Sequence, residues 1–461
     1  MKKINGRYVF FIASVSAMGG LLFGYDWVVI GGAKPFYERF FGIVGSTSLQ
    51  AWAMSCALIG CIVGAVASGV ISERFGRKKP LVLSALLFVV ASVGTGLSDT
   101  YTLFVVFRII GGVGIGLASA ISPMYIAEIA PSHLRGRFVS LNQLTIVIGI
   151  LLAQVINLLI AEKVPENVTD EFIRLSWNGQ VGWRWMFYAC AVPALAFFVL
   201  AFIVPESPRW LIKMGKTGKA LDTLEKIGGE SYAREEVGKI QETLNVVAEK
   251  VDLKELLNRK YRFVLLIGIV LAVFQQWCGI NTVFNYAEEI FTAAGYGVSD
   301  TLFNIVITGS VNLIFTLVAM FTVDNWGRKK LMVLGSIGLS AIYILLGSAF
   351  FFGFKGIPVL TLVVAAIAVY AMSLAPIVWV ILSEIFPNRV RGAAMALATF
   401  VLWIACFILT YTFPILNSSL GAAGTFWVYA GVCLLGFLFI VKNLPETKGK
   451  SLEEIEHQVV K

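Results

Sequence analysis

Charged residues are scarce in this chain. Asp, Glu, Lys and Arg make up 14% of its 461 residues, whereas 58% are hydrophobic. A water-soluble domain must cover its surface with polar groups, and so few charges cannot do this. The composition therefore excludes a soluble globular protein and indicates that lipid is the solvent for most of the chain.

The residue types that many enzymes and metal sites require are also scarce. The two histidines, His133 and His457, lie outside the middle of the apolar runs, and no phosphate-binding loop of the Walker type occurs. The six cysteines lack the spacing of a metal site or a disulfide framework, so we interpret them as packing residues. We expect no enzyme activity, no metal, no cofactor and no use of ATP.

Long apolar runs recur along the whole chain. A helical crossing needs roughly 20 apolar residues, and the sequence offers about twelve such runs. They do not alternate every second residue, which excludes a transmembrane barrel. The first run is too long for a cleavable signal peptide, so we expect it to remain as a membrane helix. The expected spans are 8–32, 48–72, 80–97, 101–127, 138–161, 184–204, 263–287, 301–323, 331–353, 358–382, 393–416 and 425–443.

The formal net charge of +9 is distributed unevenly over the loops. Lys and Arg collect in alternate loops, as in Arg77 to Lys79 and Arg328 to Lys330, whereas the other loops are nearly bare or acidic. This is the positive-inside pattern, which predicts both termini in the cytoplasm and argues against a nucleic-acid partner.

Three loop sequences occur twice. SERFGRKK (72–79) recurs as VDNWGRKK (323–330), AEIAPSHLRGR (127–137) as SEIFPNRVRG (383–392), and PESPRW (205–210) as PETKGKSL (445–452). Offsets of roughly 240–256 residues predict a duplicated six-helix bundle. We expect bundles at 1–204 and 263–445, a linker of short amphipathic helices at 205–262, and a cytoplasmic tail at 446–461.

These motifs resemble the sugar porter family of the major facilitator superfamily over essentially the whole chain. The motifs GYD (24–26), RIIGGVGIG (108–116), PESPR (205–209), QQWCGIN (275–281), VDNWGRKK and PETKG (445–449) occur in order. The resemblance is greatest to bacterial proton-coupled sugar symporters of the xylose type, with similarity to facilitative glucose transporters. It implies an all-α membrane protein with twelve transmembrane helices in two six-helix pseudo-repeat bundles.

Several amides and an indole lie deep in the apolar runs. A sugar is neutral and covered with hydroxyls, so it is best matched by amides, which donate and accept, and by an aromatic surface. Gly279 offers a helix break that would turn Asn281 toward the same cavity as Gln276. The alternative is that such amides only join helices. The resemblance implies sugar contacts, and the full set is Gln143, Gln275, Gln276, Asn281, Asn312, Trp379 and Trp403.

Four positions depart from the family pattern. Asn285 stands where many members carry Tyr, and Leu402 and Cys406 where several carry Asn or Gln. Ile150 resembles the facilitative glucose transporters, whereas xylose symporters have Gln there. Each change alters which hydroxyls find a partner, so the sequence leaves the identity of the sugar open.

Asp26 lies inside the first apolar run, where a carboxylate is costly and indicates function. We expect Arg108 of the fourth run to be its partner. If their separation changes during transport, Asp26 would exchange a proton in each cycle, which the resemblance also implies. The alternative is a permanent ion pair that only stabilises the bundle.

The repeated loops carry acids and bases in corresponding positions. Ion pairs among them would close the cytoplasmic end when the other end is open; the alternative is that they only determine topology. The candidates are Glu73, Arg77, Glu128, Arg135, Glu206, Arg209, Asp324, Arg328, Glu384, Arg391 and Glu446.

The sequence therefore predicts a monomeric sugar:proton symporter of the plasma (bacterial inner) membrane that works by alternating access. A facilitative uniporter on the same scaffold is the close alternative, and a sugar-sensing receptor is a more distant one.

Overall fold

The structure is a computed structural model that describes residues 4–131, 134–165, 168–246, 256, 258–387, 390–448 and 454. The regular elements of these residues are all helical. Among them are 11 candidate membrane spans, which agree with the apolar runs of the sequence. The long helices are α1 (Gly6–Phe40), α2 (Thr47–Phe75), α3 (Lys78–Leu97), α4 (Tyr101–Ile129), α5 (Arg135–Ile160), α7 (Trp183–Ala201), α11 (Arg259–Trp277), α14 (Val298–Trp326), α15 (Arg328–Phe351), α16 (Ile357–Met372) and α18 (Arg391–Asn443).

Helix α18 contains two predicted spans. Gly421 has φ 68° and ψ 173°, which no helix allows, so the backbone breaks between the predicted runs 393–416 and 425–443. The remaining candidate spans each correspond to one predicted run. The prediction of an all-helical protein with about twelve membrane helices is therefore confirmed for the described part of the chain.

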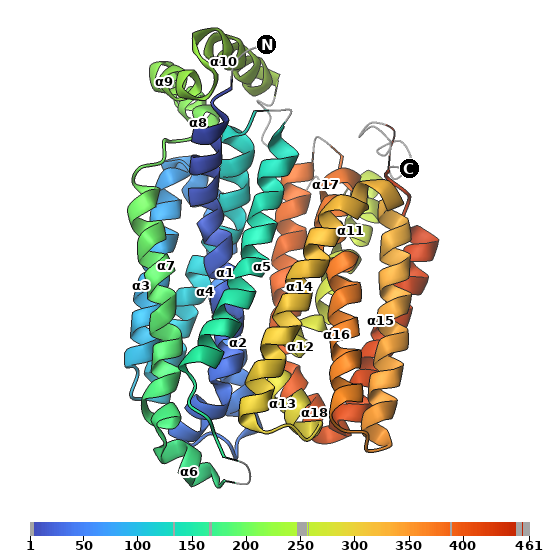
Figure 1. The fold of residues 1–461 in the computed structure, drawn as a ribbon. Coiled ribbons are helices and arrows are strands. Elements are labelled where there is room, and N and C mark those ends of the chain that lie inside the picture. Colours follow the sequence, from blue (N-terminus) through green and yellow to red (C-terminus); the bar gives the residue numbers. More distant parts are fainter. Residues whose placement is uncertain are drawn as a thin grey trace. The chain divides into compact units, whose positions relative to one another are not determined.

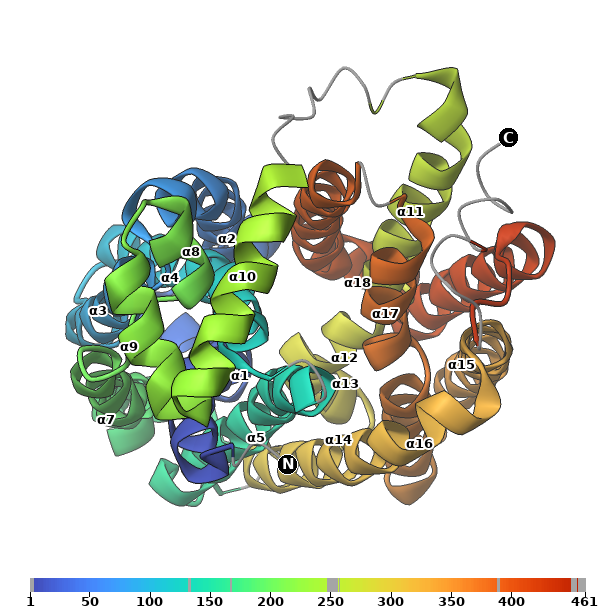
Figure 2. The ribbon, with the colours of Figure 1, turned by 90° about the horizontal axis from the view of Figure 1, so that it is seen from above.

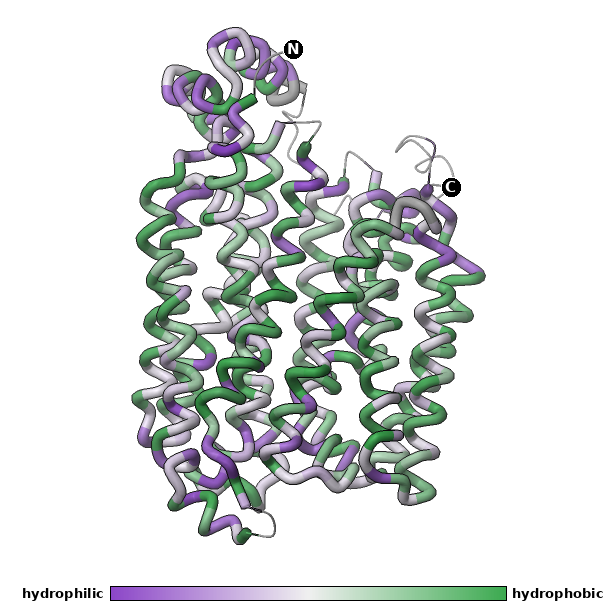
Figure 3. The backbone as a smooth tube through the Cα atoms, in the orientation of Figure 1, coloured by the Kyte–Doolittle hydropathy of each residue, from purple (hydrophilic) through white to green (hydrophobic). Residues whose placement is uncertain are grey.

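The long helices expose apolar side chains on their outer faces. Val70 of α2, Leu159 of α5 and Phe321 of α14 are each more than 70% exposed, and the tube in Figure 3 is hydrophobic along most of the length of these helices. Such surfaces are stable in contact with lipid tails rather than water. The protein is accordingly a multi-pass membrane protein.

The described residues form two compact units. Unit 1 contains Met1–Asp26, Ile59–Gly149 and Tyr188–Lys250, and unit 2 contains Trp27–Leu58, Ile150–Phe187 and Val251–Lys461. In unit 1, α3 packs along α4. In unit 2, α15 packs against α16 and α18, and α14 lies beside α16 (Figure 2). The division predicted from the repeats, with boundaries at 205 and 263, stays a prediction.

Three short helices of unit 1 lie at the N-terminal end of α1: α8 (Pro208–Lys213), α9 (Thr217–Gly228) and α10 (Glu230–Val246) (Figure 1). Their apolar faces form a cluster that includes Trp210, Leu224 and Val237 and that also holds Val9 of α1. The backbone N–H of Asn5 donates to the carbonyl of Ile227 at 2.7 Å. The three helices thus each turn an apolar face to this cluster, and the predicted linker at 205–262 stays a prediction.

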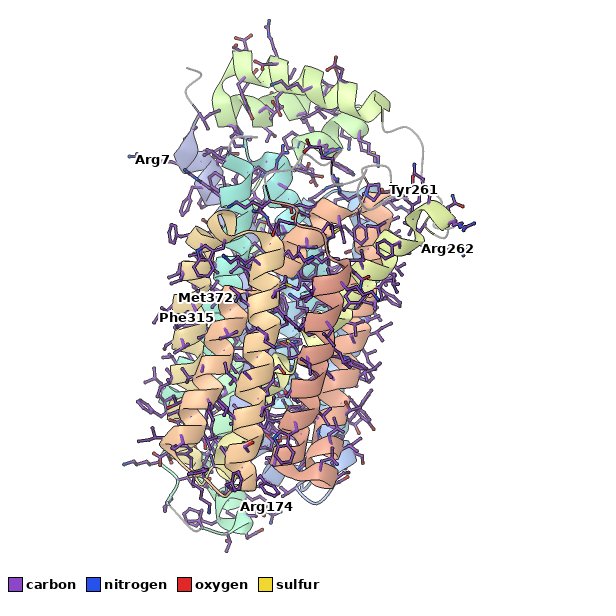
Figure 4. The ribbon with its side chains drawn as sticks, turned by 90° about the vertical axis from the view of Figure 1, so that its right-hand side faces the viewer. Arg7, Arg174, Tyr261, Arg262, Phe315 and Met372 are labelled. Carbon is purple, nitrogen blue, oxygen red and sulfur yellow. The ribbon has the colours of Figure 1, made fainter. Side chains whose placement is uncertain are left out.

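Unit 2 also contains short helical elements. They are α6 (Asp170–Leu175), the π-helical turn Asn178–Gly182, α12 (Ile280–Asn285), α13 (Ala287–Ala293) and α17 (Leu374–Ile385). Of these, α12 and α17 belong to the candidate spans Arg259–Asn285 and Ile357–Ile385. In Figure 4, Arg174 of α6 marks one end of this unit, Arg262 of α11 marks the other, and Phe315 of α14 lies between them.

Helices α2 and α4 approach each other closely in unit 1. A Cβ added to Gly60 would lie 2.1 Å from the carbonyl oxygen of Ile109, and one added to Gly64 would lie 2.3 Å from that of Val113. Gly116 faces the carbonyl of Cys61 in the same way. Small residues spaced four apart let membrane helices pack backbone to backbone. This contact has no room for a side chain.

We expect Gly64→Val to destabilise the protein by about 1–3 kcal/mol, because the branched side chain forces α2 and α4 apart. Gly69→Val in the same helix is the matched control, since a Cβ at Gly69 meets no atom within 4 Å. Thermal unfolding of both variants in detergent measures the difference. Equal melting temperatures would show that this close approach is not needed.

Candidate functional site

Asp26 and Arg108 form a buried ion pair within unit 1. Arg108 Nη1 donates to Asp26 Oδ1 at 2.8 Å, and the two residues are 3% and 4% exposed. Arg108 Nη2 also reaches the backbone carbonyl of Asp26 at 3.5 Å. Glycine at position 111 leaves space beside the carboxylate, because a Cβ there would stop 3.9 Å from both Asp26 oxygens. The pairing expected from the sequence is present.

The second carboxylate oxygen of this pair is available for chemistry. Asp26 Oδ2 is buried and has no hydrogen-bond partner among the described residues. The carboxylate of Asp26 thus has one oxygen paired with Arg108 and one buried oxygen without a partner among the described residues.

The amides of unit 2 gather where a membrane helix is interrupted. Helix α11 ends at Trp277 and α12 begins at Ile280. Between them Gly279 has φ +86°, a left-handed conformation that favours glycine. The predicted break at Gly279 is confirmed.

The interrupted helix brings three of the predicted amides into contact. Asn281 Nδ2 donates to Gln276 Oε1, and Gln276 Nε2 lies 3.5 Å from Gln275 Oε1. Gln275 Nε2 reaches the carbonyl of Ala375 on α17 at 3.3 Å. The three amides form a chain of donors and acceptors that is buried except at Asn281, which is half-buried.

Aromatic rings accompany these amides in unit 2. Trp403 of α18 is 5% exposed, and its ring centroid lies 6.2 Å from that of Trp27. Helix α17 begins directly after a backbone break at Ser373. Trp379 lies in this helix and is 37% exposed. Indole faces of this kind suit the apolar side of a sugar ring.

The two remaining predicted contacts lie elsewhere. Asn312 is buried on α14 of unit 2. Gln143 is half-buried on the part of α5 that belongs to unit 1. Among the described residues of unit 2, no contact joins Asn312 to the three amides, and the roles of Asn312 and Gln143 stay predictions.

Glu128 and Glu206 hold one copy of the repeated charge motif together in unit 1. Arg77 Nη2 donates to Glu128 Oε1 at 2.7 Å, and the Ser207 hydroxyl donates to the other Glu128 oxygen. Glu206 accepts from the backbone N–H of Arg77 at 2.8 Å. This carboxylate sits at the start of α3, where a helix presents unpaired N–H groups.

Unit 2 repeats the ion pair and the helix cap with corresponding residues, whereas Thr447 Oγ1 and Glu384 Oε2 have no partner among the described residues. Arg328 Nη2 lies 3.4 Å from Glu384 Oε1, and Glu446 accepts from the backbone N–H of Arg328 at 2.9 Å and of Lys329 at 3.1 Å. Burial opposes the charge of Glu446, but hydrogen bonds from four backbone N–H groups hold the pKa of that carboxyl below its usual range. Each copy joins residues of a single unit.

The other predicted gate residues take different positions. The backbone carbonyl of Glu73 accepts from the Trp210 indole at 2.9 Å, and Arg391 Nε donates to the carbonyl of Phe386 at 3.1 Å. Arg135 and Arg209 are exposed. The side chain of Asp324 lies outside the described residues.

A buried charge cluster in unit 2 was not predicted from the sequence. Lys34, near the end of α1, lies 2.6 Å from Glu289, 3.2 Å from Glu38 and 3.5 Å from Glu288, and is 3% exposed. Gln50 donates to Glu38 at 3.1 Å. Burial raises the pKa of Glu289, and the nearby Lys34 charge opposes this shift. One ammonium thus holds three carboxylates from two helices.

The available signal was a lysine four residues before a glutamate inside GGAKPFYERF, at helical spacing. The predicted first span ended at residue 32, whereas α1 continues through Pro35 to Phe40. That early end placed Lys34 in a loop, where a charge needs no explanation. The predicted end of the first span at residue 32 was therefore wrong. Pro35 removes one backbone hydrogen-bond donor, but α1 continues through it and keeps Lys34 inside the helix.

We expect Lys34→Met to destabilise the protein by about 3–5 kcal/mol at pH 8, because three carboxylates lose their buried cation. Burial raises the pKa of Glu289, so protonation of this carboxyl relieves part of the repulsion and the loss should be smaller at pH 5. Lys355→Met removes the same charge from an exposed position of the same unit and is the control. Thermal unfolding in detergent is the measurement, and a pH-independent loss would contradict this explanation.

Glu446→Gln should lower the melting temperature at pH 7 because a neutral amide binds the four N–H groups less strongly. The carboxylate has a lowered pKa in the folded protein, so its contribution is present above its unfolded pKa of about 4.3 and is lost as the pH falls below that value. The difference between wild type and variant should therefore narrow below about pH 4. Thermal scans across pH test this, and a constant difference would contradict it.

Comparison with known proteins places these features in context. Residues 12–458 match the family described as "Sugar (and other) transporter". The D-xylose-proton symporter of Escherichia coli (strain K12) and the arabinose-proton symporter of Bacillus subtilis (strain 168) are each 40% identical to this chain, with 98% of this chain and 96% of the relative covered.

Solved structures agree with the sequence comparison. The xylose transporter XylE from E. coli in an inward-open conformation aligns with a TM-score of 0.85 at 38% identity, covering 98% of this chain and all of that chain. The same transporter bound to 6-bromo-6-deoxy-D-glucose aligns with a TM-score of 0.80. With its duplicated charge motif, interrupted helix and buried Asp–Arg pair, this chain belongs to the sugar porter family of the major facilitator superfamily.

Proposed function

We propose that this protein imports a monosaccharide together with a proton by alternating access. The observation that carries the proton-coupled part is the buried Asp26–Arg108 pair, in which one carboxylate oxygen has a partner and the other has none. A permanent structural ion pair gains from having every buried polar atom satisfied. A proton site instead needs an oxygen that is free to bind the proton.

The chemistry of the sugar site is supported by the amides of the interrupted helix. Gln275, Gln276 and Asn281 carry no net charge and present both donors and acceptors, which match the hydroxyls of a neutral sugar. In this structure they bond to one another. A sugar can exchange these bonds for its own at little cost, because the number of hydrogen bonds is kept.

The related proteins narrow the substrate class but not the sugar. Relatives named for xylose, arabinose and glucose have similar identities, of 40%, 40% and 39%. We propose a pentose or hexose as the substrate, with Gln143, Asn312, Trp379 and Trp403 as further contacts. One proton moving down 100 mV supplies about 2.3 kcal/mol, enough for on the order of fifty-fold accumulation.

The duplicated charge motif supports a role in the conformational change. In each unit an arginine, a glutamate and a second glutamate at a helix start tie three chain segments together at one end. We propose that this end is cytoplasmic, that both termini lie there, and that the pairs change strength between inward-facing and outward-facing states. We further propose that the protein is a monomer in the bacterial inner membrane.

A facilitative uniporter is the second candidate. The 2.8 Å contact between Asp26 and Arg108 would suit a permanent pair, and Ile150 matches the facilitative glucose transporters at that position. In that case the carboxylate would stabilise the fold without exchanging protons.

The test is uptake of radiolabelled xylose, glucose, galactose, fructose and arabinose into proteoliposomes, with and without an imposed proton gradient. We expect accumulation above equilibrium that an uncoupler abolishes. Asp26→Asn should abolish accumulation but spare sugar exchange across the membrane, because the sugar contacts remain.

Asp222→Asn is the matched control, since it removes an exposed carboxylate from α9 and should leave accumulation unchanged. If the sugar only equilibrates across the membrane and the imposed proton gradient has no effect, the protein is a uniporter instead. Transport of none of these sugars would reject the proposed function.

A further inference from the structure

Four buried amides of unit 2 lie on helices that approach one another: α5 meets α14 at Gly309 and α1 at Gly32, and α1 meets α12 at Gly31. Gln154 and Asn157 lie one turn apart on α5, Asn285 ends α12, and Asn304 lies on α14. The four residues are 2%, 2%, 4% and 5% exposed, respectively. None of them belongs to the amide chain of Gln275, Gln276 and Asn281.

These four side chains leave an unusual number of polar atoms unsatisfied. Both side-chain atoms of Gln154, the oxygens of Asn157 and Asn285, and the nitrogen of Asn304 have no hydrogen-bond partner among the described residues. Each such atom lowers the stability of the folded protein when it is buried without a partner. Unsatisfied buried groups that cluster in this way indicate a bound partner such as a ligand or water.

Gln154 has no alternative partner because it lies directly against a neighbouring helix. Its Oε1 lies 1.8 Å from the position that a Cβ of Gly309 would take, so only glycine permits this approach. Asn157 approaches Gly32 of α1 in the same way and donates from Nδ2 to the carbonyl of Val29 at 3.0 Å. One amide of the pair is thus anchored, while the other has both of its groups free.

The surface of α14 that Gln154 faces is polar. Gly309 lies three residues before Asn312, a proposed sugar contact, and on the same side of the helix. Thr301, Asn304 and Thr308 lie on the same buried side of α14. Polar side chains that follow one inner face of a membrane helix mark the path of a polar solute.

We propose that Gln154 is a sugar-contacting residue that helps to decide which sugar is accepted. The proposal rests on the proposed sugar transport. Its amide donates from Nε2 and accepts at Oε1, so it can bind two hydroxyls of a neutral sugar at once. A sugar whose hydroxyls reach Gln154 forms hydrogen bonds with both Nε2 and Oε1. A sugar that lacks one of those hydroxyls leaves one of these buried atoms unpaired and therefore binds more weakly.

The experiment is sugar exchange by proteoliposomes containing wild type or Gln154→Met, which keeps the side-chain volume but removes both hydrogen-bonding groups. Affinities are measured for sugars that differ at one carbon: glucose against xylose, and glucose against galactose. We expect the preferred sugar of wild type to bind about tenfold or more weakly to the variant, and the ratio between the paired sugars to move toward one. Gln154→Asn should restore part of the selectivity.

Gln180→Met is the matched control, because it removes an exposed amide of the same unit whose Nε2 bonds only to a backbone carbonyl, at 2.7 Å, and it should leave every affinity unchanged. If Gln154 only holds water, Gln154→Met will melt at the same or a higher temperature with unchanged selectivity, which would overturn this proposal alone. Wild type that exchanges no sugar would overturn the proposed function and this inference together.

Discussion

This structure depends on one constraint: polar groups inside a membrane cannot form hydrogen bonds with water. In a bilayer each polar group of the interior must find a partner within the protein, and each charge must find an opposite one. The chain meets this requirement with local clusters. Asp26 is held by Arg108, and Lys34 by three carboxylates. Where the requirement is left unmet, at Asp26 Oδ2 and around Gln154, we infer that a proton or a sugar completes the site.

The same constraint explains the duplicated motif at the helix ends. A helix leaves its first N–H groups without partners, and in both units a glutamate from a distant loop accepts from them. Gly76 and Gly327 precede these helices with φ of 88° and 89°, and a Cβ at either position would meet the capping carboxylate. The same glutamate cap thus occurs at the start of α3 and at the start of α15, which accounts for the matching loop sequences.

Helix contact and helix interruption serve different purposes in this protein. Between α2 and α4, glycines let two backbones approach and so fasten unit 1 together. At Gly279 a glycine instead ends a helix inside the membrane, and the amides on either side of the break can then face the same site. The backbone groups released by such a break are tolerated only where protein or substrate surrounds them.

The sequence by itself determined the fold class, the approximate spans, the Asp26–Arg108 pair and the break at Gly279. Each of these follows from a local property: apolar length, the cost of a lone intramembrane charge, or the freedom of glycine at positive φ. The duplicated loops predict two six-helix bundles, and that division of the chain stays a prediction.

Only the tertiary structure decided which side chains meet. Lys34 and Gln154 look unremarkable in the sequence, since one seems to follow a span and the other resembles any polar residue on a membrane helix. Lys34 became significant because α1 continues past Pro35 and brings it to Glu288 and Glu289. Lys34 and Glu288 are 254 residues apart in the sequence. Gln154 became significant because Gly309 of another helix leaves room for its amide. Whether a polar group is satisfied depends on distances between segments far apart in the chain, and local spacing carries no information about them.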